Sequence, residues 1–203
     1  MHVAAWIPRR AGERGALEAG AFAALLPGGR PVADTAARVD IAAAWGVSTL
    51  PTETGRSSSQ MIDAIHNDHL DALVIGGVDI ADLPDAARAT QAMKKAFVVS
   101  LEIAHSSVTE IADVVLPVAA VTEKYGTFVN WEGRQRTFAA AVGDSLNRSD
   151  VRILSALADA MGESIMLGTV TAAAREFAQL GKWDGARAPF TSIAAASAQK
   201  VSG

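Results

Sequence analysis

The sequence predicts an α/β fold, built on a doubly wound, mostly parallel sheet and followed by a helical C-terminal extension. Three apolar runs carry this prediction, at residues 71–77, 96–101 and 113–116. Each ends at glycine, proline or a polar loop, and continuous apolar runs are typical of strands buried on both faces of a parallel sheet. Residues 83–95, between the first two runs, have helical character, so the segment is predicted to form a βαβ unit.

The elements before this unit are punctuated by proline and glycine. Serines are the predicted helix caps, at residues 57–59 and at Ser106 or Ser107, and helices are predicted to end at glycine. In chain order we expect a strand at residues 2–7, a polar glycine-rich loop at 9–15, a linker with Pro27, Gly28, Gly29 and Pro31, a helix at 35–45 stopped by Gly46, and a helix after the capping serines 57–59.

Shorter elements are expected after the βαβ unit. After Gly126 the residue pattern changes to two extended runs on either side of Glu132 and Gly133, and this pattern predicts a hairpin. We expect a short helix at 106–111, helices at 150–161 and 169–180 that end at Gly162 and Gly181, and little regular structure in the last twenty residues.

Three segments are expected along the chain. Residues 1–56 hold the N-terminal strand, the glycine-rich loop and a connecting helix, as part of the same α/β unit. Residues 57–163 form the α/β core, and residues 164–203 form a helix and a partly disordered tail. With 203 residues, the chain is long enough to bury a core.

The composition excludes several classes of function. A net charge of −4 gives no basic field for nucleic acid. Apolar stretches such as residues 114–121 are far shorter than the roughly 20 residues of a membrane-spanning helix. The N-terminus has no basic region before its apolar stretch, so we expect no secretory signal. We therefore expect a cytoplasmic location. The chain has no cysteine, which removes disulfides and the thiolates that iron-sulfur clusters require.

Two turns at the carboxyl ends of predicted strands are candidate binding loops, because open α/β sheets bind ligands there. Gly76, Gly77 and Asp79 follow the first strand, but neither a dinucleotide fingerprint nor a P-loop is present, so a plain strand-end turn is favoured. Glu102 and His105 follow the next strand as a potential acid/base pair. No nucleophile or substrate pocket accompanies them, so a structural loop is favoured there too.

The residues His66, Asp68 and His69 bring two imidazoles and a carboxylate close together. A third ligand of suitable spacing and a second shell are not evident. We therefore expect a solvated helix end and no metal site.

The most distinctive motif spans residues 111–136. An apolar strand ends in Leu-Pro, and a carboxylate and a Gly-Thr-Phe-x-Asn-x-Glu-Gly-Arg sequence follow. The positions are Ile111–Pro117, Glu123, Gly126, Thr127, Phe128, Asn130, Glu132, Gly133 and Arg134. This pattern resembles the signature of the molybdopterin oxidoreductase superfamily. The physical role favoured for it is structural: glycines for tight turns, Asn130 and Glu132 bonded to loop amides, and Arg134 paired with a carboxylate such as Glu123. A vestigial anion pocket is the alternative.

Within that superfamily, residues 6–16 and 26–31 resemble the large iron-sulfur subunit of bacterial, in particular actinobacterial, NADH:quinone oxidoreductase (complex I). The resemblance implies an excerpt that supports electron transfer from NADH to quinone, without catalytic residues or a redox centre in this stretch. Iron-sulfur clusters would lie in an upstream part of the subunit. The implied partners are that upstream part and other peripheral-arm subunits. The implied location is cytoplasmic, or on the cytoplasmic face of the inner membrane through the complex.

A second hypothesis is a fragment of a molybdopterin-dependent enzyme, similar to formate dehydrogenase, in which Gly76, Gly77, Asp79, Glu102 and His105 hold the pterin dinucleotide. Catalytic members carry a Thr-Glu-Thr segment after the second strand, and residues 102–110 lack it. This departure favours the first hypothesis. A free-standing α/β nucleotide-binding protein is a third and weaker one.

Overall fold

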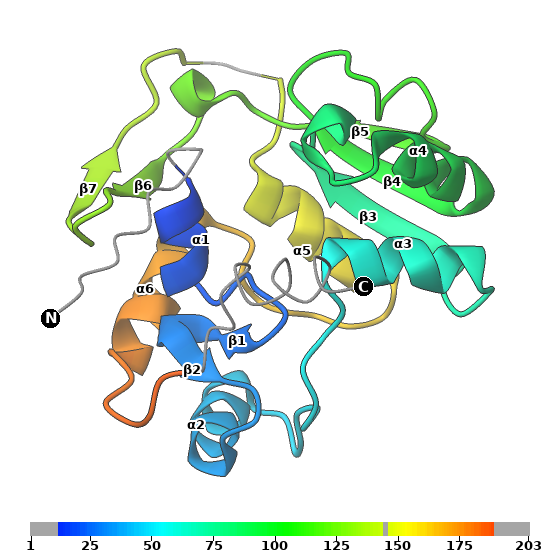
Figure 1. Ribbon diagram of the computed structural model, residues 1–203. Helices are drawn as coiled ribbons and strands as arrows, with labels where there is room; N and C mark the ends of the chain where they lie inside the picture. The colour runs from blue at the N-terminus through cyan, green and yellow to red at the C-terminus, as the bar shows by residue number, and fades with distance from the viewer. Residues whose placement is uncertain (1–11, 144–145, 189–203) are drawn as a thin grey trace, which may run out of the picture. The chain divides into compact units, whose positions relative to one another are not determined.

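The computed structural model describes residues 12–143 and 146–188, which divide into two compact units (Figure 1). Residues 12–15 and 55–179 belong to the first unit, and residues 16–54 and 180–188 to the second. The strand expected at residues 2–7 and the tail expected after residue 188 lie outside the described residues. The domain boundaries after residues 56 and 163 stay a prediction, because compactness alone does not show which segments fold independently.

The first unit is built on a parallel sheet of three strands in the order β3-β4-β5. Two helices accompany it, one before β3 and one between β3 and β4. The elements are α3 (Ser58–His66), β3 (Ala72–Gly76), α4 (Ala86–Lys95), β4 (Phe97–Glu102) and β5 (Val114–Pro117). The predicted α/β class and the predicted βαβ unit are confirmed.

Both helices begin at side-chain caps. Ser57 caps α3 as predicted: its hydroxyl accepts from the Gln60 amide at 3.3 Å, and the Gln60 side chain accepts from the Ser57 amide at 2.8 Å. The helix expected from residue 83 begins later, because Asp85 is its cap and accepts from the Arg88 amide at 2.9 Å. Pro84 therefore lies outside α4.

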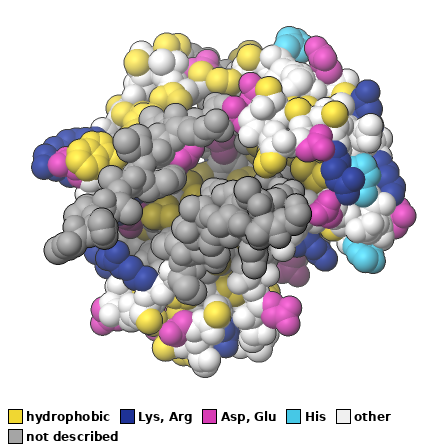
Figure 2. All heavy atoms as spheres, in the orientation of Figure 1, with side chains coloured by type: hydrophobic (Ala, Val, Ile, Leu, Met, Phe, Trp, Pro, Cys, Tyr) yellow, Lys and Arg dark blue, Asp and Glu magenta, His cyan; other side chains and the backbone are white. Residues whose placement is uncertain are grey.

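The hydrophobic core fills the space between one face of the sheet and the two helices. Its buried members come from α3, α4, β3, β4 and the following turns: Ile62, Ile65, Ile75, Ile80, Ala89, Ala92, Met93, Ala96, Val98 and Val108. The solvent side of α3 and α4 carries the charged and histidine side chains that Figure 2 shows on the right. These helices are thus amphipathic and cover only one face of the sheet.

The turn after β4 corrects one prediction. Residues 107–111 form a turn in place of the expected short helix. The Ser106 amide donates to the Thr109 hydroxyl at 2.8 Å, and the Thr109 amide donates to the Ser106 hydroxyl at 3.3 Å. These reciprocal bonds close a single turn, and Val108 at its centre is fully buried in the core.

The rest of the first unit contains the predicted hairpin and the two predicted helices. The β6 and β7 strands pair antiparallel, and α5 and α6 begin and end within one residue of expectation. The further elements are η2 (Ile80–Asp82), η3 (Val121–Glu123), β6 (Gly126–Val129), β7 (Gln135–Phe138), α5 (Asp150–Ala160) and α6 (Val170–Leu180), which ends at the border of the second unit. One loop prediction is wrong, since residues 13–15 begin α1 (Glu13–Glu18).

The described part of the second unit, residues 16–54 and 180–188, contains a small hairpin and one complete helix. The β1 strand (Leu25–Leu26) pairs antiparallel with β2 (Arg30–Pro31) across the turn η1 (Pro27–Gly29). The α2 helix (Thr35–Trp45) begins at the Asp34 cap and ends at Gly46 with φ 65°, as predicted. The linker expected around residues 27–31 is thus a tight hairpin.

A buried arginine holds this unit together. The Arg30 residue is 4% exposed, and its guanidinium donates to the carbonyls of Pro27 and Gly181 at 3.2 Å and of Leu180 at 2.9 Å. It also donates to the Asp40 carboxylate at 3.3 Å and lies 5.7 Å from the centre of the Trp183 ring. Residues 180–183 are therefore fixed to β2 by hydrogen bonds and by a cation–π contact.

Candidate functional site

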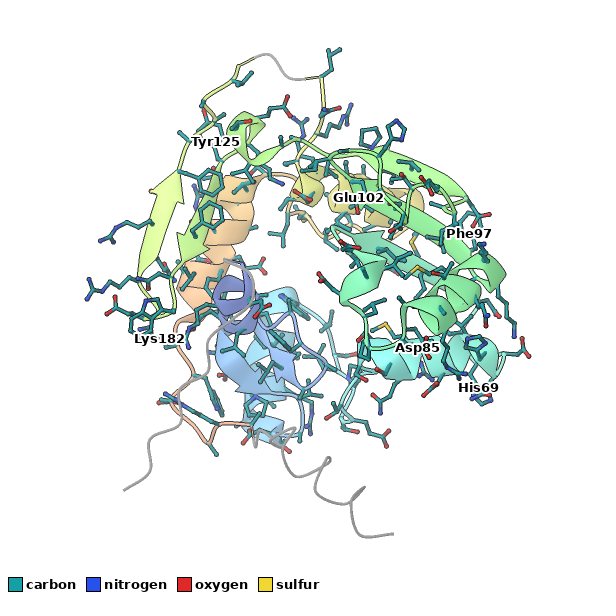
Figure 3. The ribbon with its side chains drawn as sticks, turned by 45° about the horizontal axis from the view of Figure 1, so that its top comes forward. His69, Asp85, Phe97, Glu102, Tyr125 and Lys182 are labelled. Atoms are coloured by element: carbon teal, nitrogen blue, oxygen red, sulfur yellow. The ribbon has the colours of Figure 1, made fainter. Side chains whose placement is uncertain are left out.

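A cleft of the first unit opens at the carboxyl ends of β3 and β4, with a volume of about 780 Å³. Five residues singled out in the sequence line it, from the two strand-end turns: Gly76, Gly77, Asp79, Glu102 and His105. Glu102 is marked at its strand end in Figure 3. The structure thus brings together two loops that are distant in the sequence, as the parallel pairing of Gly76 with Leu101 requires.

The turn after β3 is shaped by glycine and aspartate. Gly77 has φ 62°, a conformation that residues with a side chain rarely adopt. The Asp79 carboxylate accepts from the Ala81 amide at 3.0 Å and thereby starts η2. This bond gives Asp79 a local structural role in addition to its place in the lining of the cleft.

The lining of the cleft combines apolar and acidic side chains. Val74, Leu101, Val118 and Leu154 contribute apolar surface. Three carboxylates also line it, those of Asp79, Glu102 and Asp150. Among the described residues that line the cleft, Lys124 is the one lysine or arginine, and it already forms an ion pair with Asp150.

This charge distribution decides which ligands suit the cleft. Asp79 and Glu102 have no cationic partner in the described part of the chain, so the cleft attracts cations and repels anions. The diphosphate of a pterin dinucleotide requires unpaired cations or several free backbone amides. The described lining offers no unpaired lysine or arginine, and its other donors are the side chains of His105, Ser106 and Ser107 and the backbone of the glycine turn.

The hairpin part of the predicted site lies elsewhere. Gly126, Thr127, Asn130, Glu132 and Gly133 are on β6 and in the β6–β7 turn, and the described lining of the cleft does not include them. The two strand-end loops, which the second hypothesis assigns to pterin binding, thus line one cleft. The residues of the family signature on the hairpin are not part of its described lining.

The signature turn has a structural explanation. The Asn130 side chain accepts from the amides of Glu132 at 3.1 Å and Arg134 at 2.8 Å. Gly133 has φ 83°, which favours glycine. At Gly126 an added Cβ would lie 2.4 Å from the Phe138 ring, so the ring requires a glycine there.

One expected ion pair is wrong. Arg134 pairs with Glu132, at 3.1 Å between Nε and Oε2, and not with Glu123. The Glu123 carboxylate accepts instead from the Ala120 amide at 2.8 Å and caps η3. A bond to a nearby orphan amide fixes fewer side-chain rotamers than a distant ion pair, which explains the preference.

Sequence reasoning missed Lys124, Asp150 and Leu154 as lining residues of the cleft. Lys124 lies on the loop after η3, and Asp150 and Leu154 lie on α5. No local period connects these positions with the strand-end turns. The one signal available was the predicted start of a helix at residue 150.

The cluster His66, Asp68 and His69 is a solvated helix end in the structure. Asp68 bonds Lys95 at 2.7 Å, and this hydrogen bond, with the charge of Lys95, lowers the pKa of the Asp68 carboxyl. The His66 ring contacts the Arg88 carbonyl at 3.2 Å. Within residues 12–143 and 146–188, no group of three potential ligands is placed to hold a metal ion.

Residues 6–160 match the model of the molybdopterin oxidoreductase family. The parallel α/β core, the strand-end cleft and the hairpin all fall within these residues. The chain belongs to this family. Among its described helices, none is both long and apolar enough to cross a bilayer.

Curated relatives fall into two groups. A subunit of the NADH-quinone oxidoreductase of Streptomyces coelicolor is 53% identical over 90% of this chain, and the subunit of the same name from Mycobacterium tuberculosis is 53% identical over 94%. A nitrate reductase of Symbiobacterium thermophilum is 34% identical over 71% of the chain. The chain spans only 22%, 24% and 20% of these three proteins.

Proposed function

We propose that this chain is a structural part of the large iron-sulfur subunit of an NADH:quinone oxidoreductase. The observation that carries the proposal is 53% identity to the NADH-quinone oxidoreductase subunits of two organisms along nine tenths or more of the chain. Identity at this level over nearly the whole chain supports a shared fold and shared packing surfaces. The part would support electron transfer from NADH to quinone by holding its neighbours in position.

The proposed partners are the rest of the large subunit and the neighbouring subunits of the peripheral arm. The chain has no cysteine, so iron-sulfur clusters would be bound by residues outside it. We propose that it works without a cofactor of its own and is located on the cytoplasmic face of the membrane through the assembly.

A second candidate is a piece of a molybdopterin-dependent oxidoreductase. The similarity to the nitrate reductase and the shared cleft of Gly76, Gly77, Asp79, Glu102 and His105 favour it. The three carboxylates in the lining of this cleft are the observation against it. A diphosphate beside the unpaired carboxylates of Asp79 and Glu102 would be repelled.

The proposal is tested by tagging the chain in its native host and isolating what binds to it. We expect a particle that contains iron and transfers electrons from NADH to a quinone. Met61→Asp, on the exposed side of α3, should leave the particle intact. Ile65→Asp places a charge in the core and should abolish incorporation, because the fold is lost.

Recovery of the folded chain without any NADH-oxidising partner would contradict the proposal. A particle that reduces nitrate or oxidises formate would favour the second candidate.

A further inference from the structure

The second face of the parallel sheet is apolar, and it is uncovered except at the end next to the cleft, where Leu101 is buried. The strand register places Ala72 beside Phe97, Val74 beside Val99, and Val99 beside Val114. We call these five residues the open sheet face. Val74 is 56% exposed, Phe97 52% and Val114 37%, whereas Leu73 and Val98 on the opposite face pack into the core.

Parallel sheets are normally covered on both faces, since their strands are apolar on both. The α3 and α4 helices cover only the first face of this sheet. A contiguous exposed apolar patch marks an interaction site. The geometry of a twisted sheet face is the one onto which a helix packs.

The open sheet face continues into the acidic cleft. Val74 belongs to both, and the cleft lies at the carboxyl end of the same strands, on the side of Glu102 in Figure 3, with Phe97 at the other end of β4. An occupant that lies along the strands therefore meets apolar side chains first. At the cleft it meets the unpaired carboxylates of Asp79 and Glu102.

We propose that an amphipathic helix covers the open sheet face, with an aliphatic stripe along the strands and a lysine or arginine at the end that enters the cleft. The charge of the cleft selects the basic residue. We assign the helix to the portion of the large subunit that the relatives carry outside the match, because the match covers only 22% and 24% of those proteins. This inference rests on the proposed function.

The test is photo-crosslinking inside cells, before the assembly is isolated. A benzophenone amino acid replaces Phe97, and a second variant carries it at Val114 in case the first fails to fold. The control carries it at Phe22, an exposed phenylalanine of the second unit. We expect adducts from Phe97 and Val114 to a helical peptide with a lysine or arginine, from the portion outside the match.

Charge is tested in the same strain. Glu102→Gln should lower the adduct yield about fivefold, as expected for a partly buried charge pair. Glu110→Gln is the matched control: within the described residues this exposed carboxylate forms no ion pair and lies outside the cleft lining, so the yield should not change.

Each contrary result has a distinct meaning. Adducts to a second copy of the chain or to another subunit, or a yield no higher than at Phe22, would overturn the inference even when the NADH-oxidising particle is recovered. Loss of the particle with the expected adduct still formed would overturn the proposed function alone.

Discussion

Replacing Arg30 by methionine tests what holds the second unit together. The substitution removes three hydrogen bonds to carbonyls and leaves the acceptors of Pro27, Leu180 and Gly181 without this donor. At roughly 1.5 kcal/mol for each charge-assisted bond, offset by about 1 kcal/mol from burying methionine, the expected loss of stability is about 3.5 kcal/mol. The ion pair with Asp40 adds little, because that carboxylate is half exposed.

The assay is urea unfolding of the chain, followed by tryptophan fluorescence, since Trp183 lies against Arg30. Amide exchange should show residues 180–183 opening first. The control is Arg38→Met, which removes one carbonyl bond, to Val32 at 2.7 Å, and should cost about 1 kcal/mol. A loss below about 1 kcal/mol for Arg30→Met, or equal losses for both variants, would refute the reasoning.

Three further predictions concern the first unit. Ile65→Ala should lower the free energy of unfolding by about 3 kcal/mol in chemical denaturation, because Ile65 is buried in the core, whereas Met61→Ala on the exposed side should cost under about 1 kcal/mol. Ser100→Ala should leave stability unchanged or raise it by about 1 kcal/mol, since the buried hydroxyl has no partner among the described residues; a clear loss would reveal one. Lys95→Ala should raise the pKa of Asp68 in an NMR titration, and an unchanged pKa would contradict the contact. The ion pair stabilises the fold at pH values above the pKa that Asp68 has in the unfolded chain. This contribution is lost as the pH falls through the lowered pKa that Asp68 has in the folded chain.

The sequence predicted those elements whose signals are local. Ser57 and Gln60 form the expected cap, Gly46 ends its helix, and three apolar runs become parallel strands. Where prediction failed, a competing local bond decided the outcome. Ser106 and Thr109 bond each other and close a turn, although serine is also a good helix cap.

The candidate site could be predicted only in part. The rule that ligand loops follow parallel strands placed Gly76, Asp79 and Glu102 in one cleft. The ion pair of Lys124 and Asp150, which neutralises the one lysine or arginine of the described lining, depends on how the loop after β5 meets α5. Contacts between such distant segments leave no periodic trace in a single sequence.

The measurement that tests the central claim most directly is the molybdenum, pterin and iron content of the isolated particle, per chain. A structural part of an NADH:quinone oxidoreductase predicts iron without stoichiometric molybdenum or pterin at this chain, in a particle that oxidises NADH. One pterin dinucleotide per chain, lost when the cleft is blocked by Gly77→Trp and retained in the control Gly162→Trp, at a glycine that also has a positive φ and open space around it, would contradict it.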